Sequence, residues 1–333
     1  MFIVESYTVA VAMCFITMLC WGSWANTQKL ASSEWQFQLF YWDYSLGVLL
    51  LTLLFAFTIG STGEAGRAFM PDISQASGEA IQSALIGGAV FNLANILLVA
   101  AIDIAGMAVA FPVAIGLALV IGVVTNYMAE PVGDATFLFA GVGLVTAAII
   151  VCALIYARLP QDGDRSVGKG LAISVIAGIA MGFFYRFVAA SISFDFASPE
   201  AGLMTPYSAG VVFAVGLLVS NVIWLIPLQY KPISGDVAPL GEYFSKGTPR
   251  LHLVGILGGA IWCVGFSFSF IASGAAGPAI SYGLGQGATM VAAFWGVFIW
   301  KEFKDAPAGT SGMIAAMFAL FIVGLGLIVY SGQ

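Results

Sequence analysis

The chain has 333 residues, of which 60% are hydrophobic and 8% are charged, and its formal net charge is -6. Soluble globular domains carry about 25% charged residues, so the composition excludes that class and indicates a polytopic membrane protein. The 4 cysteines lie inside apolar runs without metal-ligand spacing. No nucleic-acid partner is expected, and the net charge itself says little about partners, because in a membrane protein the side on which each charge lies matters more.

Apolar runs of roughly 20 residues, the length needed to cross a hydrocarbon core of about 30 Å, recur along the whole chain. The ten predicted spans are 6–27, 36–58, 81–101, 106–127, 134–157, 168–190, 206–227, 251–271, 278–300 and 309–331. The first run carries Glu5 and no basic segment before it, which favours a spanning helix over a cleaved secretory signal. The predicted fold class is an all-α polytopic membrane protein with ten transmembrane helices.

The basic residues predict the orientation, because Lys and Arg accumulate in cytoplasmic loops. The connections after odd-numbered spans contain Lys29, Arg158, Arg165, Lys169, Lys231, Lys246, Arg250, Lys301 and Lys304. Only Arg67 lies in a connection on the other side. The odd-numbered connections are therefore predicted to be cytoplasmic and both termini non-cytoplasmic. We expect a multi-pass protein of a cell membrane, with the inner membrane of a bacterium as the simplest location.

An internal repeat relates the third predicted span to the eighth. The stretch IGGAVFNLANI at 86–96 aligns with LGGAIWCVGFS at 257–267. The same offset of 171 residues brings Gly106 onto Gly277. A repeat of this length predicts two structurally similar halves.

The two halves contain five predicted spans each. The stretch YSLG at 44–47 also aligns with YSAG at 207–210. The predicted units are a five-helix repeat at 1–158, a short cytoplasmic linker at 159–167 and a second five-helix repeat at 168–333. Because five is odd, the second half enters the membrane from the opposite face. Such inverted repeats are frequent in secondary transporters, whose substrate sites lie between the repeats near the bilayer midplane.

The second predicted span carries a carboxylate, Asp43, about 10 Å from its start at Gln36. An acidic side chain on a spanning helix costs about 2.5 to 3.5 kcal/mol on insertion scales, so it usually faces a protein-lined cavity. A carboxylate also binds a proton more readily when a cavity closes over it. Asp43 is therefore the candidate for binding a coupling proton, unless it lies shallow enough to reach the headgroups.

Two amides, Asn92 and Asn95, lie three residues apart on the third span and share one helix face. Asn95 is expected about 10 Å from the cytoplasmic side, near the level of Asp43. Amides donate and accept hydrogen bonds, which suits an uncharged solute with carbonyl, N–H or hydroxyl groups. Alternatively, both asparagines only bridge neighbouring helices.

The ninth span places Tyr282 and Gln286 on one face, and three glycines at 283–287 weaken the helix beside them. The repeat counterparts of these glycines flank Pro112 in the fourth span. Helix interruptions at corresponding places in both halves point to a transporter site. Tyr282 and Gln286 are therefore candidates for solute binding, although the glycines would equally serve close helix packing.

Three tryptophans and one histidine complete the candidates. Trp21 and Trp24, near the inner end of the first span, either belong to the interfacial aromatic belt or stack on a planar ligand. Trp262 is the repeat counterpart of Phe91 and is a candidate to line the cavity beside the asparagines. His252, the only histidine, is expected simply to lie at the membrane interface.

Three stretches carry a family resemblance: WDYSLGVLLLTLLFAF at 42–57, GGAVFNLANI at 87–96 and GLALVIGVVTNYMAEPVGDATFLFAGVGL at 116–144. They resemble segments of ureide permeases, a branch of the drug/metabolite transporter superfamily related to bacterial glucose/ribose and rhamnose porters. The resemblance implies a proton- or ion-coupled carrier of small polar solutes such as ureides, oxopurines, pyrimidines or neutral sugars. Plant members have a long central cytoplasmic loop with a nucleotide-binding-like motif, whereas a short segment joins the halves here. Nothing about nucleotide regulation therefore transfers.

The sequence predicts a secondary active transporter that takes up a small polar uncharged solute with protons and works by alternating access. Its expected partners are that solute, a coupling proton or sodium ion, and the lipid bilayer. No cofactor, metal or enzymatic activity is expected, and the protein is expected to be a monomer or a homodimer. Two alternatives stay open: an exporter of drugs or metabolites from the same superfamily, and a non-transporting membrane receptor or scaffold.

Overall fold

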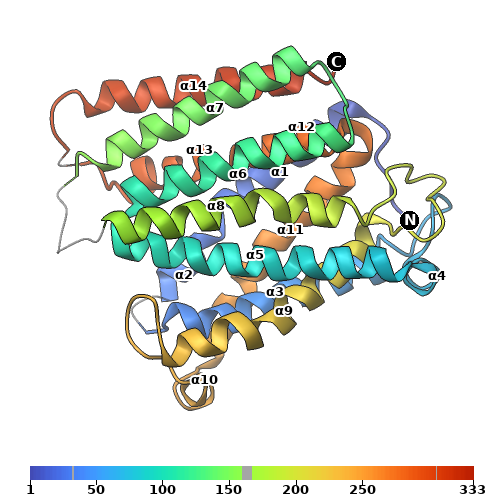
Figure 1. The fold of residues 1–333 in the computed structure, drawn as a ribbon, viewed down its shortest axis with the longest axis horizontal. Helices are drawn as coiled ribbons and strands as arrows, with labels where there is room; N and C mark the ends of the chain where they lie inside the picture. The colour runs from blue at the N-terminus through green and yellow to red at the C-terminus, as the bar shows by residue number, and fades with distance from the viewer. Residues whose placement is uncertain (32–33, 160–166, 305) are drawn as a thin grey trace.

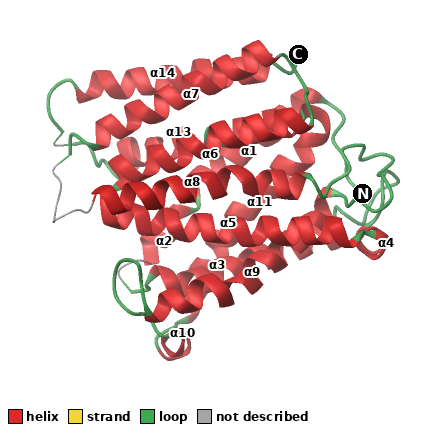
Figure 2. Cartoon of the chain, viewed as in Figure 1, coloured by secondary structure: helices red, strands yellow, loops and turns green. Residues whose placement is uncertain are grey.

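The computed structural model describes residues 1–31, 34–159, 167–304 and 306–333, which form a bundle of long helices (Figure 1). These residues form helices and loops without a β-sheet (Figure 2). Within them, ten helical segments are long and apolar enough to span a membrane. The predicted class, an all-α polytopic membrane protein with ten spans, is confirmed.

The described part of the first half forms five spans and one short outlying helix. Its elements are α1 (Tyr7–Ser23), α2 (Ala25–Ala31), α3 (Phe37–Phe57), α4 (Phe69–Gln75), α5 (Gly78–Ala105), α6 (Met107–Ala129) and α7 (Ala135–Tyr156). α1 and α2 together make the first span, and α4 lies between the second and third. Side-chain oxygens of Ser77 and Asp134 accept hydrogen bonds from the first turns of α5 and α7, which fixes where these helices begin.

The described part of the second half repeats this plan. Its elements are α8 (Val167–Ala189), α9 (Pro206–Tyr230), α10 (Leu240–Ser245), α11 (Pro249–Ala276), α12 (Pro278–Gly285), α13 (Ala288–Phe294), the π-helical turn η1 (Trp295–Ile299) and α14 (Thr310–Tyr330). α9, α11 and α12 each begin with a proline, which is favourable at the first helical position because that residue needs no N–H donor. α12, α13 and η1 together make the ninth span.

The ninth span is interrupted at Gln286 and Gly287, between α12 and α13. Hydrogen bonds from Gly287 N to Leu284 O (3.0 Å) and from Thr289 N to Gln286 O (3.2 Å) tighten the chain into a 3₁₀-like turn. The matching interruption predicted for the fourth span was wrong, because α6 continues through Pro112. Proline is tolerated in spanning helices when neighbouring groups satisfy the freed backbone carbonyl.

Helices of the two halves correspond at the offset of 171 residues. α5 and α11 have 28 residues each. Each ends at a glycine with positive φ, Gly106 (φ 81°) and Gly277 (φ 78°), and the next helix begins at the following residue. Glycine adopts this backbone without strain, so the same tight reversal is built twice. The short helices α4 and α10 begin at the same offset.

Close helix packing also repeats between the halves. A Cβ atom on Gly47 of α3 would lie 2.2 Å from the carbonyl oxygen of Ile256 on α11. A Cβ atom on Gly216 of α9 would lie 2.3 Å from the carbonyl oxygen of Leu85 on α5. Positions 85 and 256 are counterparts at the offset of 171, so Gly47 corresponds in its packing to Gly216. The sequence alignment had paired Gly47 with Gly210 instead.

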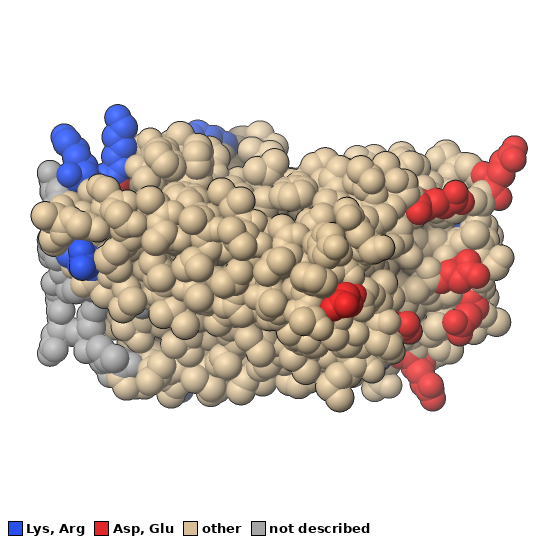
Figure 3. Space-filling view, turned by 90° about the horizontal axis from the view of Figure 1, so that it is seen from above, with Lys and Arg blue, Asp and Glu red and all other residues tan. Residues whose placement is uncertain are grey.

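The charged residues separate towards the two ends of the bundle: Lys and Arg gather at one end and many Asp and Glu at the other (Figure 3). We call the end that contains the connections after odd-numbered spans the basic end, and the opposite one the acidic end. Both termini lie at the acidic end (Figure 1). Of the predicted linker at 159–167, residues 160–166 lie outside the described residues.

Candidate functional site

A cavity of about 360 Å³ lies between helices of both halves, and we call it the central cavity. Its described wall contains six aromatic side chains: Trp21, Trp24, Phe91, Phe111, Phe184 and Trp262. The rings of Trp21 and Trp262 stack with their centroids 5.9 Å apart. Aromatic faces at such distances stack on one another and on flat ligands. The structure thus places Trp21, Trp24 and Trp262 in one cavity wall.

Polar side chains interrupt this wall at four positions: Gln28, Asn95, Gln286 and Thr289. Asn95 is 4% exposed, and its Nδ2 atom donates to Tyr41 Oη at 3.1 Å, which fixes the plane of the amide. The Gln286 side chain is 7% exposed and makes no hydrogen bond to the described residues. The described lining contains no charged side chain. The arrangement therefore fits an uncharged ligand with hydrogen-bond donors and acceptors.

The helix break gives Gln286 its position. Gln286 follows the last turn of α12, and its backbone carbonyl bonds forward to Thr289 in the tight turn that joins α12 to α13. The glycines at 285 and 287 let this turn approach α1, since Cβ atoms there would lie within 3.0 Å of Trp21 and Met18 side-chain atoms. The glycines thus serve close packing as well as the break.

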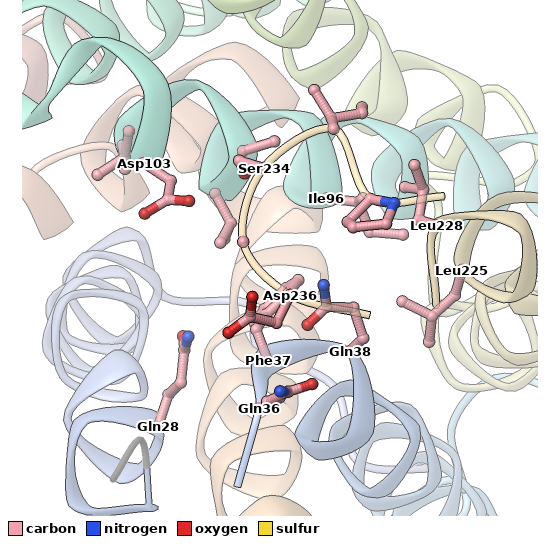
Figure 4. Close-up of a pocket in the computed structure, with 16 residues that line it drawn as sticks. Gln28, Gln36, Phe37, Gln38, Ile96, Asp103, Leu225, Leu228, Ser234 and Asp236 are labelled. Carbon is pink, nitrogen blue, oxygen red and sulfur yellow. The ribbon is translucent and has the colours of Figure 1, made fainter. Parts of the chain in front are cut away.

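A second space of about 490 Å³, which we call the vestibule, lies between the central cavity and the basic end. Gln28, Val99 and Ile102 line both spaces, so the two adjoin each other. Figure 4 shows polar side chains around the vestibule: Gln28, Gln36, Gln38, Asp103 and Asp236. Its described lining contains no Lys or Arg. A space with polar side chains therefore adjoins the central cavity on the side of the basic end.

Tyr282 lies outside the described lining of the central cavity, so its role in solute binding stays a prediction. It is fully buried, and its Oη atom lies 3.2 Å from the carbonyl oxygens of both Ala118 and Met181. Its ring packs on Tyr185, which stacks on Phe270, with centroid distances of 4.9 and 4.1 Å. We call Tyr185, Phe270 and Tyr282 the aromatic barrier. Because α12 begins at the acidic end and reaches the cavity at its last turn, the barrier lies between the cavity and that end.

Asn92 also lies outside the described cavity lining. Its Nδ2 atom lies 2.8 Å from Ser220 Oγ and 2.9 Å from Asn221 Oδ1, both on α9. Asn221 in turn donates to Ser45 Oγ on α3 at 2.9 Å. These hydrogen bonds join α5, α9 and α3 in the middle of the bundle. Asn92 therefore bridges helices, as the alternative reading had allowed, while Asn95 one turn further reaches the cavity.

Asp43 is 1% exposed and lies outside the described lining of both the central cavity and the vestibule. His252 Nδ1 lies 2.9 Å from its Oδ2 atom and 3.1 Å from its Oδ1 atom, and Tyr243 Oη donates to Oδ1. Successive side chains of a helix point about 100° apart, so Asp43 faces α10 and α11 while Tyr44 packs on Trp24 behind the cavity wall. The structure thus separates the carboxylate from the amides with which the sequence had grouped it.

His252 was expected only to lie at the interface, and this is corrected by its contact with Asp43. Its ring also packs on Trp35 and Tyr243, with centroid distances of 5.5 and 4.7 Å. Burial, together with the neighbouring carboxylate, raises the pKa of Tyr243, so its hydroxyl stays protonated and acts as a donor. Sequence reasoning missed both partners because they are 209 and 200 residues away from Asp43. The signal available for His252 was that the only histidine lies near the basic end of its span, as Asp43 does.

Comparison with known proteins places the chain in a family. The family model described as Ureide permease matches residues 40–169 and 161–331. Ureide permease 5 of Arabidopsis thaliana is 23% identical over 99% of this chain and 96% of its own length. Ureide permease 1 of the same plant is 24% identical over 99% of this chain and 99% of its own. A solved crystal structure that is 15% identical covers 97% of this chain and 96% of that chain with a TM-score of 0.59, which supports the fold alone.

The two matched segments cover nearly all of the chain from the second span to the last. The resemblance to ureide permeases that the sequence motifs indicated is thereby confirmed. The described residues also hold no group of His, Cys, Asp and Glu suited to a metal ion. The chain belongs to the ureide permease family, and it is a multi-pass membrane permease and not an enzyme.

Proposed function

We propose that this permease is a secondary active transporter of a small, polar, uncharged solute of the ureide type. The observation that carries the proposal is the central cavity, where the amides of Asn95 and Gln286 lie among aromatic rings. The described lining has no charged side chain, so a charged solute would lose its hydration there without gaining a partner. The names of the relatives, which are ureide permeases, support the same class of solute.

The chemistry of the cavity wall further narrows the range of candidate solutes. An amide side chain accepts from an N–H group and donates to a carbonyl group, and ureides carry both groups next to each other. The faces of Trp21 and Trp262 suit a flat molecule. Nucleobases share this combination of flat ring and amide-like edge, whereas monosaccharides lack the flat face. Ureides and nucleobases are therefore the favoured solutes, and sugars are the less favoured ones.

Transport is proposed to proceed by alternating access between two inverted repeats, 1–158 and 168–333, joined by the linker at 159–167. The equal lengths of α5 and α11, with the matching turns that follow them, support the repeat. The vestibule adjoins the cavity on the side of the basic end, and the aromatic barrier lies on the other side. This combination supports a conformation open to one side, as alternating access requires.

The basic end is proposed to be cytoplasmic, with both termini outside, because Lys and Arg accumulate on the cytoplasmic side. The separation of charges in Figure 3 supports this orientation. The described conformation is then open to the cytoplasm. The relation to the drug/metabolite transporter superfamily, a bacterial inner-membrane location and a monomeric or homodimeric state stay part of the proposal.

Proton coupling is proposed to involve Asp43. A carboxylate on a spanning segment is costly unless it has a partner or a proton, and such residues commonly mark proton paths. Asp43 is buried on α3, which also carries Tyr41, the hydrogen-bond partner of the cavity residue Asn95. Protonation of Asp43 and the shape of the cavity wall are therefore linked through one helix.

The test is uptake of radiolabelled allantoin, uracil and glucose by the purified full chain in proteoliposomes, with and without an imposed pH gradient. We expect saturable uptake of allantoin or uracil that an inward proton gradient increases, and little uptake of glucose. Folded protein that moves none of the three would contradict the proposal. Flux only in the opposite direction would favour the exporter, and a solute-induced thermal shift without any flux would favour the receptor.

A further inference from the structure

The contact between Asp43 and His252 lies outside the described lining of the solute cavity, and the cavity does not account for it. The carboxylate is buried on α3, and the imidazole that meets it comes from the first turn of α11. We propose that Asp43 and His252 together hold the single coupling proton, and that this proton exchanges with water at the basic end through His252. The proposal rests on the proton-coupled transport proposed above and identifies the site where the proton is held.

The geometry places one proton between two groups. His252 Nδ1 lies within 3.1 Å of both carboxylate oxygens, so a proton on this nitrogen points at the carboxylate. Tyr243 supplies a second hydrogen bond to Oδ1. With the shared proton, the pair is neutral in sum, either as imidazolium with carboxylate or as imidazole with carboxylic acid. Without the proton, a bare carboxylate stays in the span, which is unfavourable unless Asp43 gains access to water.

The side chains of His252 and Asp43 differ in how far they are exposed to water, and this difference indicates the path of the proton. The His252 side chain is 28% exposed, whereas the Asp43 side chain is 1% exposed. Water at the basic end therefore reaches the imidazole first. A Cβ atom on Gly247 would lie 2.2 Å from His252 Nε2, so the absence of a side chain there makes room for the ring. The proton is exchanged at the ring and held at Nδ1, next to the carboxylate.

The neighbouring charged groups are already paired with each other. On α10, Lys246 contacts Glu242 at 2.8 Å. From α11 and the α2–α3 connection, Arg250 contacts Glu34 at 2.8 Å. Trp35 covers the imidazole with an edge contact and brings no charge. Asp43 is therefore the carboxylate that contacts His252 among the described residues.

The acidic end provides an internal comparison. Asp72 on α4 is fully buried and lies 2.8 Å from Arg67 Nε, and it also accepts hydrogen bonds from Thr205. A guanidinium group stays protonated in proteins, so this partner cannot release a coupling proton. α10 corresponds to α4 at the offset of 171. Of these two corresponding ends, the basic end is the one where the partner of the buried carboxylate is an imidazole and not a guanidinium group.

The pair also connects proton binding to the cavity. α3 carries Asp43 and Tyr41, and Tyr41 Oη accepts a hydrogen bond from Asn95 in the cavity wall. α11 carries His252 and Trp262, and the Trp262 ring lines the same cavity. Loss of the proton weakens the attachment of α3 to α10 and α11 at the basic end. Of these helices, α11 lines the solute cavity through Trp262, and α3 contacts the cavity wall through the hydrogen bond of Tyr41 with Asn95.

The sequence contains 1 histidine, which allows a direct test without any solute. The full chain, labelled with ¹⁵N-histidine, purified with a histidine-free tag and placed in lipid nanodiscs, gives NMR signals from a single imidazole. We expect an Nδ1–H signal shifted downfield by its hydrogen bond to the carboxylate, and loss of that shift in Asp43→Asn. Lys246→Gln, which removes an exposed charge on α10, is the control and should leave the signal unchanged. The same Nδ1–H signal in wild type and Asp43→Asn would overturn the proposal.

A second test separates proton coupling from solute movement. In proteoliposomes, allantoin exchange at equal pH measures solute movement, and accumulation under a pH gradient measures coupling. In His252→Asn the amide nitrogen can still donate to Asp43 but cannot carry the proton, so accumulation relative to exchange should be lost. Tyr243→Phe is the control, because it removes a hydrogen bond to Asp43 but leaves the imidazole in place. It should retain the wild-type ratio of accumulation to exchange, which would show that disturbing the contact does not by itself abolish coupling.

The outcomes distinguish the two proposals. If wild type accumulates allantoin and His252→Asn does so equally well, the proposal about His252 is overturned while proton-coupled transport stands. If wild type exchanges allantoin without any response to pH, proton coupling fails and this proposal fails with it. If wild type does not move allantoin at all, the solute class is contradicted, and the NMR signal alone decides whether the proton site exists.

Discussion

The rings of Phe91 and Trp262 lie 4.4 Å apart, centroid to centroid, and the two residues are counterparts at the offset of 171. Phe91 belongs to α5 and Trp262 to α11, two helices of equal length in opposite halves of the chain. The two rings therefore contact each other across the boundary between the halves. Both rings line the central cavity, so in the proposed alternating-access mechanism a movement of one half against the other would change the cavity wall at this contact.

The cavity amides are predicted to affect solute affinity, and the bridging amide to affect stability. Asn95→Ala and Gln286→Ala should each weaken allantoin binding by about two- to tenfold, because a lost hydrogen bond costs about 0.5 to 1.5 kcal/mol. Asn92→Ala should instead lower the melting temperature, since its partners lie on α9. Calorimetric titration and thermal unfolding of the three variants check this. A loss of affinity confined to Asn92→Ala would contradict the assignment.

The corresponding close contacts are predicted to respond alike to added volume. Gly47→Ala and Gly216→Ala should each cost about 1 to 3 kcal/mol, because the new methyl group meets a backbone carbonyl that cannot move freely. Gly143→Ala is the matched control, since nothing lies within 4 Å of a Cβ atom there. Thermal unfolding in nanodiscs gives the comparison. Equal melting temperatures for all three variants would show that the contacts are looser than described.

The sidedness of the bundle is predicted to appear in thiol labelling. Thr62 and Lys231 are both exposed, at the acidic and the basic end respectively. In intact cells a membrane-impermeant maleimide should label Thr62→Cys, and Lys231→Cys should react only after permeabilisation. Three of the native cysteines, Cys14, Cys152 and Cys263, are buried, which keeps the background low. The reverse labelling pattern would place the basic end outside.

The ion pair at the acidic end is predicted to be structural. Arg67→Gln should destabilise the protein by as much as about 3 kcal/mol, because removing one partner leaves the Asp72 carboxylate buried and without its cation. Arg250→Gln is the control, since its pair with Glu34 is exposed on both sides and such pairs contribute about 0 to 1 kcal/mol. Melting temperatures of the two variants measure the difference. A larger loss in Arg250→Gln would contradict this account.

The spans were predictable because their length and hydrophobicity are local properties of the chain. The break in the ninth span was also predictable, because the glycines around Gln286 weaken the helix locally. The rotation of each helix was harder to predict, since these helices are apolar on nearly every side and offer no single polar face. For this reason Asn92 and Asn95 could not be told apart, and Tyr282 was grouped with Gln286 although it belongs to the aromatic barrier.

The contact of Asp43 with His252 could not be predicted for a different reason. It depends on how α3 packs against α11, helices of opposite halves, and on the course of the connection that carries Tyr243. The repeat indicated which helices correspond, but it did not indicate which of them touch. Trp21 and Trp24 illustrate the same point, since the sequence allowed either an interfacial or a cavity position.

The charged residues of the vestibule affect which solutes can approach the central cavity. Its mouth presents Asp103 and Asp236 among glutamines, at the end of the molecule where the surrounding loops are rich in Lys and Arg. Carboxylates repel anions over a distance of about 8 Å at physiological ionic strength. Under the proposed function, these two carboxylates disfavour the approach of phosphorylated solutes, including nucleotides, in addition to the uncharged lining of the central cavity.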